Sequence, residues 1–420
     1  ELIEECGSVS RLCQIGTTTP CAMAIGATGK VDNAYEVARI IGQELRSTGF
    51  NLNLAPVLDV CTISGSANGN RLFSSDPQEV AAFGRAYLRG LSEEGMLATA
   101  KHFPGHGDTN VDSHFALPVV NKQREAIEKT ELVSFRSAIE AGVHAIMSAH
   151  VVYPALDPSG VPATVSRLIL TDLLRETLDF QGLILSDGME MQAVMDLYGI
   201  EEGCLRAMQA GVDICLVCHS PMQARMVCDY VFKAVKEGVM SEEDLLTHDA
   251  RIRTLKACLL PPKGGKEQFG SAGQKKISEV IMKEAVRILN APDGAPLPRP
   301  GRNTVFFGTP GRRSIGACDA EELNAAKLLS QHFGGTYLTL DEARTSRAQE
   351  AVIIFSRHED VDQVLDAYAW FMENGAAVTA VALSDPSPLD ELDDDSWHVC
   401  AYQYDTLSLK TLVQLLESGE

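Results

Sequence analysis

The chain has 420 residues, of which 45% are hydrophobic and 22% are charged, a composition ordinary for folded globular proteins. Its length exceeds one ordinary domain and predicts two, each with its own core. The 57 acidic residues outnumber the 36 basic ones, and the formal net charge of −21 would repel a phosphate backbone. No apolar run approaches the roughly 20 residues that a membrane-spanning helix needs. The composition therefore argues against nucleic acid and the membrane as partners.

The 11 cysteines are scattered along the chain, without the spacing of a disulfide framework or of a zinc site. Cys215 and Cys218 form a C-x-x-C, but they lie in a short apolar run with no second pair, which favours a buried strand over metal or redox work. The chain begins at Glu1 without a basic segment followed by an apolar one, so no signal peptide is visible. We therefore expect a reducing, cytoplasmic location.

Short apolar runs alternate with amphipathic stretches through the first part of the chain, the pattern of βα units that build a parallel sheet. Apolar residues at helical spacing predict a helix over residues 32–49, and Asp76 followed by Pro77 predicts the start of a second. Further helices are expected over residues 166–178 and 189–198. Strands are predicted at residues 51–59, 97–103, 145–150, 182–187 and 213–217. In all but the last strand, polar residues gather at the C-terminal end, as in a (β/α) barrel whose site is built from strand ends.

A domain boundary is predicted where Pro, Gly and Ser become frequent, between Leu260 and Lys276. We therefore expect a (β/α) barrel over residues 1–259, a linker over 260–276 and a smaller α/β sandwich over 277–420. Strands of the second domain are predicted at residues 304–308, 350–355, 377–383 and 398–402.

The densest group of titratable side chains is KHFPGHGDTNVDSH, residues 101–114, which holds three His, two Asp and one Lys. Such density costs desolvation and mutual repulsion, so it is usually kept where it takes part in chemistry, although a solvated loop is the alternative. His102, His106 and His114 could also converge on a metal ion. Their spacing matches no compact zinc pattern, and Lys101 beside them would repel a cation, so no metal is expected.

This run resembles the signature of the β-N-acetylglucosaminidase branch of glycoside hydrolase family 3. Further blocks occur in the family's order, namely LAPVLD (54–59), RLFSSDP (71–77), MSAH (147–150) and LSDGMEM (185–191). The resemblance covers essentially the whole chain, and it implies a TIM-type (β/α) barrel followed by a smaller α/β sandwich. It also implies a retaining exo-enzyme that releases terminal β-linked N-acetylglucosamine, with peptidoglycan fragments as the natural saccharide substrate. No cofactor is implied.

The resemblance makes Asp187 the nucleophile that forms a covalent glycosyl-enzyme. A carboxylate at the C-terminal end of a barrel strand suits that role, although an Asp after a strand is often a helix N-cap. The general acid/base is then His114, made more basic by Asp112, and this pair replaces the usual second carboxylate.

The family's sugar contacts match Lys101 and His102, which would hydrogen-bond ring hydroxyls, and Arg71, which would reach the same edge of the sugar. Asp59 and His150 match residues that line the pocket. The residues alone leave open a surface salt bridge for Arg71 and buried polar support for Asp59.

The sequence departs from the family at its start. The family opens its barrel with a complete βα unit and then a strand reading DxEGGRV, whose Asp and Arg help to hold the sugar. Here Ile3 and Ser8 stand at those two positions and the first βα unit is lacking. The alternatives are therefore a β-glucosidase or phosphorylase of the same family, or a non-catalytic carbohydrate-binding descendant. The presence of Asp112 and His114 argues against the β-glucosidase branch.

Overall fold

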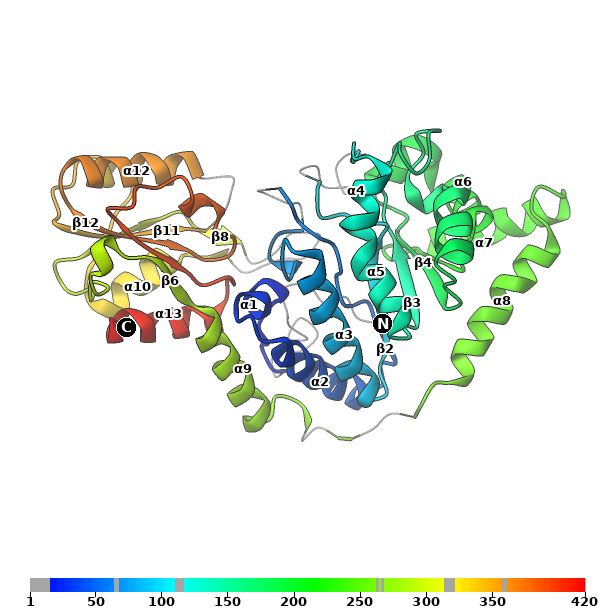
Figure 1. Cartoon of the computed structure of the whole chain (residues 1–420), viewed down its shortest axis with the longest axis horizontal. Coiled ribbons are helices and arrows are strands. Elements are labelled where there is room, and N and C mark those ends of the chain that lie inside the picture. Colours follow the sequence, from blue (N-terminus) through cyan, green and yellow to red (C-terminus); the bar gives the residue numbers. More distant parts are fainter. Residues whose placement is uncertain are drawn as a thin grey trace.

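The computed structural model describes residues 16–63, 68–109, 117–261, 264–265, 268–312, 322–356 and 361–419. Two α/β units, each with its own hydrophobic core, are joined through helix α9 (Ala272–Ala285) (Figure 1). Ile3 and Ser8 lie outside the described residues. Within the described residues, no helix is both long and apolar enough to cross a membrane.

The first unit is built on a five-stranded sheet in the order β1-β2-β3-β4-β5. These strands are Leu52–Asn53, Leu97–Phe103, Ala145–Ser148, Leu183–Gly188 and Ile214–Leu216. Each strand pairs in parallel with the next in sequence, as repeated βα crossovers require. Leu54, Met147 and Leu185 form a small apolar cluster on one face of the sheet, separate from the larger core on the helical side.

Helices of the first unit lie side by side along the outer face of the sheet (Figure 1). They are α1 (Ala22–Ala27), α2 (Val31–Ser47), α3 (Pro77–Glu93), α4 (Arg124–Lys129), α5 (Glu131–Glu140), η4 (Leu168–Thr177), α6 (Gln192–Ala210) and α7 (Pro221–Lys236), with the short 3-10 turns η2 (Gly69–Arg71) and η3 (Ala163–Val165). Helix α8 (Glu242–Ala257) differs, because its Ile252 and Leu255 pack against the small cluster on the other face.

The predicted elements of this unit are confirmed, with shifts of a few residues at most of their ends. Asp76 caps α3 by accepting the N–H groups of Gln78 and Glu79, and Pro77 occupies the first turn. The helix predicted at 189–198 differs most, since α6 starts at Gln192 and continues to Ala210 across a kink at Gly199. Gly199 has a φ of 68°, which glycine adopts without a steric penalty.

The second unit is a six-stranded sheet in the order β10-β7-β11-β12-β13-β6, parallel except for the edge strand β6. The strands are β6 (Arg287–Asn290), β7 (Val305–Gly308), β10 (Thr336–Tyr337), β11 (Glu350–Phe355), β12 (Ala377–Ala382) and β13 (Trp397–Cys400), and β8 (Gly311–Arg312) pairs separately with β9 (Glu322–Leu323). The strands predicted for this domain are confirmed as β7, β11, β12 and β13.

Helices cover both faces of this second sheet, α12 on one and α10 with α13 on the other (Figure 1). They are α10 (Ala325–Phe333), α12 (Val361–Glu373) and α13 (Thr406–Ser418), with the short α11 (Leu340–Ala343), η6 (Pro292–Gly294) and η8 (Ser387–Leu389) at the periphery. The central strands β11 and β12 are therefore buried on both sides, which explains their almost continuous apolar sequence.

The two units are held together by buried polar contacts near α1. The side chain of Gln403 accepts the N–H of Cys21 at 2.5 Å and donates to the carbonyl of Thr19 at 3.1 Å. Helix α9 begins at Ala272, inside the predicted 260–276 linker, because Ser271 and Gln274 form a capping box there.

Candidate active site

The predicted polar residues that the structure describes meet at the C-terminal ends of β1 to β4. Asp59 follows β1, Lys101 and His102 lie near the end of β2, His150 follows β3, and Asp187 lies near the end of β4. Parallel strands bring their C-terminal ends to the same edge of the sheet, which is where barrel proteins build their sites. Asp112 and His114 lie outside the described residues.

Lys101 and His102 are neighbours in sequence, yet both take part in this cluster. An irregularity in the β2–β3 pairing falls between Lys101 and Phe103, so that His102 is the extra residue of a local bulge. Bulges redirect side chains that strict alternation would place on opposite faces. Both side chains are buried, with 2% and 4% of Lys101 and His102 exposed.

Asp187 is the most accessible carboxylate of this group. Its side chain is 22% exposed, and its Oδ1 accepts the N–H of Gly188 at 2.8 Å. It is not the cap of the following helix, because α6 begins at Gln192 with Met191 at its N-cap. The N-cap reading that the sequence left open is therefore wrong, and the carboxylate is available at the strand end.

The surroundings of Asp187 favour its ionised form. Burial raises the pKa of this carboxyl, but the positive charges of His102 and His150, the N–H of Gly188 and the charge of Lys101 outweigh burial and hold the pKa well below its usual range. Asp187 is therefore an anion at neutral pH, the form that a nucleophile requires.

The imidazole of His102 lies between two carboxylates. Its Nδ1 donates to Asp59 Oδ2 at 2.7 Å, and its Nε2 lies 3.9 Å from Asp187 Oδ2. The second distance is too long for a direct hydrogen bond. His102 thus has one nitrogen bonded within the protein and one directed toward the candidate nucleophile.

Asp59 is almost completely buried, with 1% of the residue exposed. Its Oδ1 accepts the backbone N–H groups of His102 and His106 at 3.0 and 2.8 Å, and its Oδ2 also lies 3.4 Å from the amide nitrogen of Asn68. Burial raises the pKa of Asp59, but the charge and hydrogen bonds of His102 lower it further, so the pKa lies below its ordinary value. The buried-support reading of Asp59 agrees with this geometry.

His106 supports this cluster from below. Its ring lies edge-to-face against that of His102, with centroids 5.7 Å apart, and its Nδ1 is 2.6 Å from the hydroxyl of Thr109. Burial, together with the charge of His102, lowers the pKa of His106 to about 4. His106 is therefore a neutral imidazole at physiological pH.

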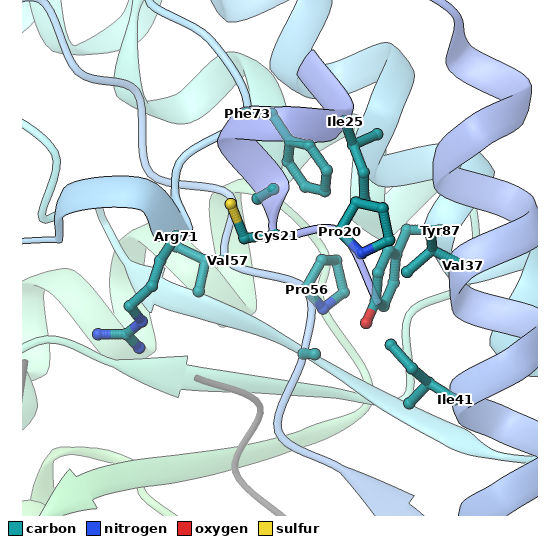
Figure 2. Close-up of a pocket in the computed structure, with 12 residues that line it drawn as sticks. Pro20, Cys21, Ile25, Val37, Ile41, Pro56, Val57, Arg71, Phe73 and Tyr87 are labelled. Atoms are coloured by element: carbon teal, nitrogen blue, oxygen red, sulfur yellow. The ribbon is translucent and has the colours of Figure 1, made fainter. Parts of the chain in front are cut away.

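Arg71 borders the polar cluster on one side and an apolar cavity on the other (Figure 2). Its Nη1 donates to Asn68 Oδ1 at 3.2 Å, and the amide nitrogen of Asn68 donates to the carbonyl of His106 at 2.8 Å. The cavity, of about 40 Å³, is lined by α1, α2, α3 and the segment after β1, including Phe73 and Tyr87. In Figure 2 the guanidinium points away from these apolar side chains. Arg71 is thus half-buried rather than part of a surface salt bridge.

His150 is completely buried, with 0% exposed. Its Nδ1 is 2.8 Å from the hydroxyl of Thr164, and its Nε2 is 3.0 Å from the carbonyl of Gly188, the residue after Asp187. Sequence reasoning missed Asn68 and Thr164, because neither belongs to a recognisable motif.

No group of three His, Cys, Asp or Glu side chains in the described part of the chain is arranged to hold a metal ion. His102 and His106, two of the three histidines considered as ligands, are instead engaged with Asp59 and Thr109. His114, the third, lies outside the described residues.

A carboxylate held ionised at the mouth of a parallel βα sheet, with cationic and hydrogen-bonding groups on neighbouring strand ends, defines the class of (β/α)-barrel proteins with a strand-end site. Comparison with known proteins defines it further. Residues 3–255 match the glycosyl hydrolase family 3 N terminal domain. The chain belongs to glycosyl hydrolase family 3, as its resemblance to that family predicted.

Two curated relatives are similar to this chain. A Beta-hexosaminidase of Xylella fastidiosa (strain 9a5c) is 40% identical over 223 residues, which are 51% of this chain and 65% of the relative. Beta-hexosaminidase A of Pseudoalteromonas piscicida is 36% identical over 281 residues, which are 61% of this chain and 46% of the relative. The chain thus spans about half to two thirds of the length of these relatives.

A solved structure resembles the whole fold. The glycoside hydrolase family 3 beta-N-acetylglucosaminidase from Paenibacillus sp. str. FPU-7 matches with a TM-score of 0.83 at 29% identity, over 96% of this chain and 81% of that one. The likeness extends across both units. It confirms the expected fold class, a TIM-type barrel followed by a smaller α/β sandwich.

Proposed function

We propose that this chain carries the catalytic centre of a retaining exo-β-N-acetylglucosaminidase, with Asp187 as its nucleophile. The observation that supports this most directly is the state of the Asp187 carboxylate. It is 22% exposed at the end of β4 and lies 3.9 Å from His102 Nε2, and its pKa is held well below the usual range by the surrounding charges and the N–H of Gly188. An anionic, accessible and rigidly mounted carboxylate can attack the anomeric carbon and form a covalent glycosyl-enzyme.

The other roles in this proposal follow the family resemblance. His114, supported by Asp112, protonates the leaving oxygen and then activates water. Lys101, His102 and Arg71 bind sugar hydroxyls. The backbone and side-chain contacts that hold Lys101 and His102 at the end of β2, beside Asp187, are in keeping with that assignment. Two displacements at the same carbon, first by Asp187 and then by water, give net retention of configuration.

The proposed substrate is a glycan with a terminal β-linked N-acetylglucosamine, and a peptidoglycan fragment is the proposed natural source. The curated relatives are named as β-hexosaminidases and the Paenibacillus structure as a β-N-acetylglucosaminidase, which supports the sugar class. The peptidoglycan source and a cytoplasmic location rest on the sequence alone. The mechanism requires neither a metal nor a cofactor.

The test is release of nitrophenol from the aryl β-N-acetylglucosaminide compared with the aryl β-glucoside. We expect turnover of the first, release of the β-anomer before mutarotation, and a loss of at least about 100-fold in kcat for Asp187→Asn, as for removal of a nucleophile. Asp196→Asn, at an exposed position on α6, is the matched control and should keep full activity. Activity retained by Asp187→Asn would refute the nucleophile assignment.

The departures at Ile3 and Ser8 give one rival a specific basis, since the family uses those two positions to hold the sugar. A folded protein that turns over neither aryl glycoside but binds N-acetylglucosamine would be a carbohydrate-binding descendant. Faster turnover of the β-glucoside would instead indicate a β-glucosidase.

A further inference from the structure

We propose that His150 and Thr164 are positioning residues that fix the orientation of the Asp187 carboxylate and do not contact the sugar. The inference rests on the proposed function, because it takes Asp187 as the nucleophile. It changes the role that the family resemblance implies for His150, from lining the sugar pocket to holding the residue after the nucleophile.

The first step concerns the proton on the ring of His150. Its Nε2 lies 3.0 Å from the carbonyl oxygen of Gly188, which can only accept a hydrogen bond. Nε2 therefore carries a proton and donates it to Gly188. The side chain is 0% exposed, so water does not replace this partner.

The second step concerns the other ring nitrogen. Nδ1 lies 2.8 Å from the hydroxyl oxygen of Thr164, which also accepts from Ser148 Oγ at 2.9 Å and lies 3.0 Å from the carbonyl of Ala149. Thr164 has one hydroxyl proton, which goes to Nδ1 when the imidazole is neutral and to Ala149 when Nδ1 is itself protonated. In either state, both ring nitrogens are engaged by the protein.

The third step links this chain of contacts to Asp187. Gly188 is held at both of its backbone polar groups, since its N–H donates to Asp187 Oδ1 at 2.8 Å and its carbonyl accepts from His150. The next peptide is fixed as well, by the N–H of Met189 to the carbonyl of Leu216 at 2.9 Å. Rotation of the carboxylate is therefore tied to the position of Gly188, and that position is tied to His150 on the neighbouring strand.

The consequence is kinetic. A nucleophile must hold its attacking oxygen in line with the anomeric carbon, and small misplacements of about 1 Å can cost about 100-fold in rate. A residue that positions Asp187 therefore acts on kcat, whereas a residue that contacts the sugar in the ground state acts on KM. His150 also contributes to the low pKa of Asp187, although less than His102 does.

Two matched pairs of variants test this proposal with the aryl β-N-acetylglucosaminide. In His150→Gln the amide nitrogen can donate from the place of Nε2, whereas His150→Leu has similar bulk and no donor. We expect His150→Leu to lower kcat by about 10- to 100-fold with KM within about twofold, and His150→Gln to recover much of the loss. Thr164→Val, which removes only the hydroxyl, should lower kcat by about 3- to 10-fold, and Thr164→Ser should not.

Thermal unfolding of each variant identifies those that fold, and if His150→Leu does not, the Thr164→Val and Thr164→Ser pair decides the question. A rise in KM at constant kcat for His150→Leu would make His150 a sugar contact and overturn the proposal. Equal kcat values for folded His150→Leu and His150→Gln would overturn it too, because a structural role does not distinguish them. Failure of the proposed function is recognised separately, since Asp187→Asn would then remain active.

Discussion

His102 donates two hydrogen bonds to Asp59, one from ring Nδ1 at 2.7 Å and one from its backbone N–H at 3.0 Å. An ionised carboxylate only accepts, so Nδ1 carries a proton and Nε2, on the side of Asp187, is the nitrogen left to meet a substrate. Asp59 therefore determines which face of the imidazole reaches the sugar. The same carboxylate holds the N–H of His106 at 2.8 Å, which ties the loop after β2 to the end of β1.

The substitution Asp59→Asn should separate this role from a purely structural one. The new amide side chain offers one acceptor oxygen to buried groups that now use two, so we expect a loss of about 1–3 kcal/mol in the free energy of unfolding. His102 would no longer be held in one tautomer, and kcat should fall by about 10- to 100-fold. Chemical denaturation and steady-state kinetics measure the two effects. A stable variant with unchanged kcat would show that the tautomer of His102 does not matter.

The buried neutral state of His106 predicts a loss of stability in mild acid. Its pKa is lowered from 6.5 to about 4 by folding, so the unfolded chain binds more protons between these values. The stabilisation is complete above pH 6.5 and is lost as pH falls toward 4. For His106 the free energy of unfolding should drop by about 2 kcal/mol between pH 7 and 5.

Urea denaturation at pH 7 and pH 5 measures that drop, with His106→Gln as the variant and His332→Gln, at a half-exposed position on α10, as the control. We expect His106→Gln to reduce the pH dependence and His332→Gln to leave it unchanged. The same pH dependence in all three proteins would contradict the assignment to His106.

Much of the fold could be predicted because hydrophobic periodicity reports burial directly. The strand at 97–103 coincides with β2, whose seven residues are all buried. The cap formed by Asp76 is a local interaction that the sequence displays, and it begins α3 as expected. The kink at Gly199 was not predicted, because the apolar pattern continues on both sides of that glycine.

The candidate site was predictable only in part. Strand ends placed Asp59, His150 and Asp187 at one edge of the sheet, which the structure confirms. Their hydrogen-bond partners were not predictable, because Thr164 reaches His150 from a separate turn and Asn68 reaches the carbonyl of His106 across 38 residues. Such contacts depend on tertiary packing and leave no local periodicity in the sequence.

The assignment of His114 predicts a dependence on the leaving group. Poor leaving groups need a proton in the first step and activated aryl groups do not, so His114→Ala should reduce turnover of a disaccharide far more than that of a nitrophenyl glycoside. Steady-state kinetics on both substrates measure the ratio, and Asp187→Asn, which should impair both equally, is the comparison. Equal losses for His114→Ala would indicate that His114 has a structural role.

A histidine in place of a second carboxylate also predicts which acceptors can attack the glycosyl-enzyme. In the second step a glutamate would be anionic and would repel phosphate, whereas neutral His114 would not, and Lys101 and Arg71 add positive charge at the proposed sugar site. Water remains the main acceptor because it is far more abundant and because Asp112 restores a negative charge nearby. We expect phosphate at millimolar levels to divert part of the flux to N-acetylglucosamine 1-phosphate, and more of it in Asp112→Asn. Product analysis at constant ionic strength measures this fraction, with sulfate as the control anion for screening. If neither protein forms the sugar phosphate, the charge of the acid/base group does not select the acceptor at this site.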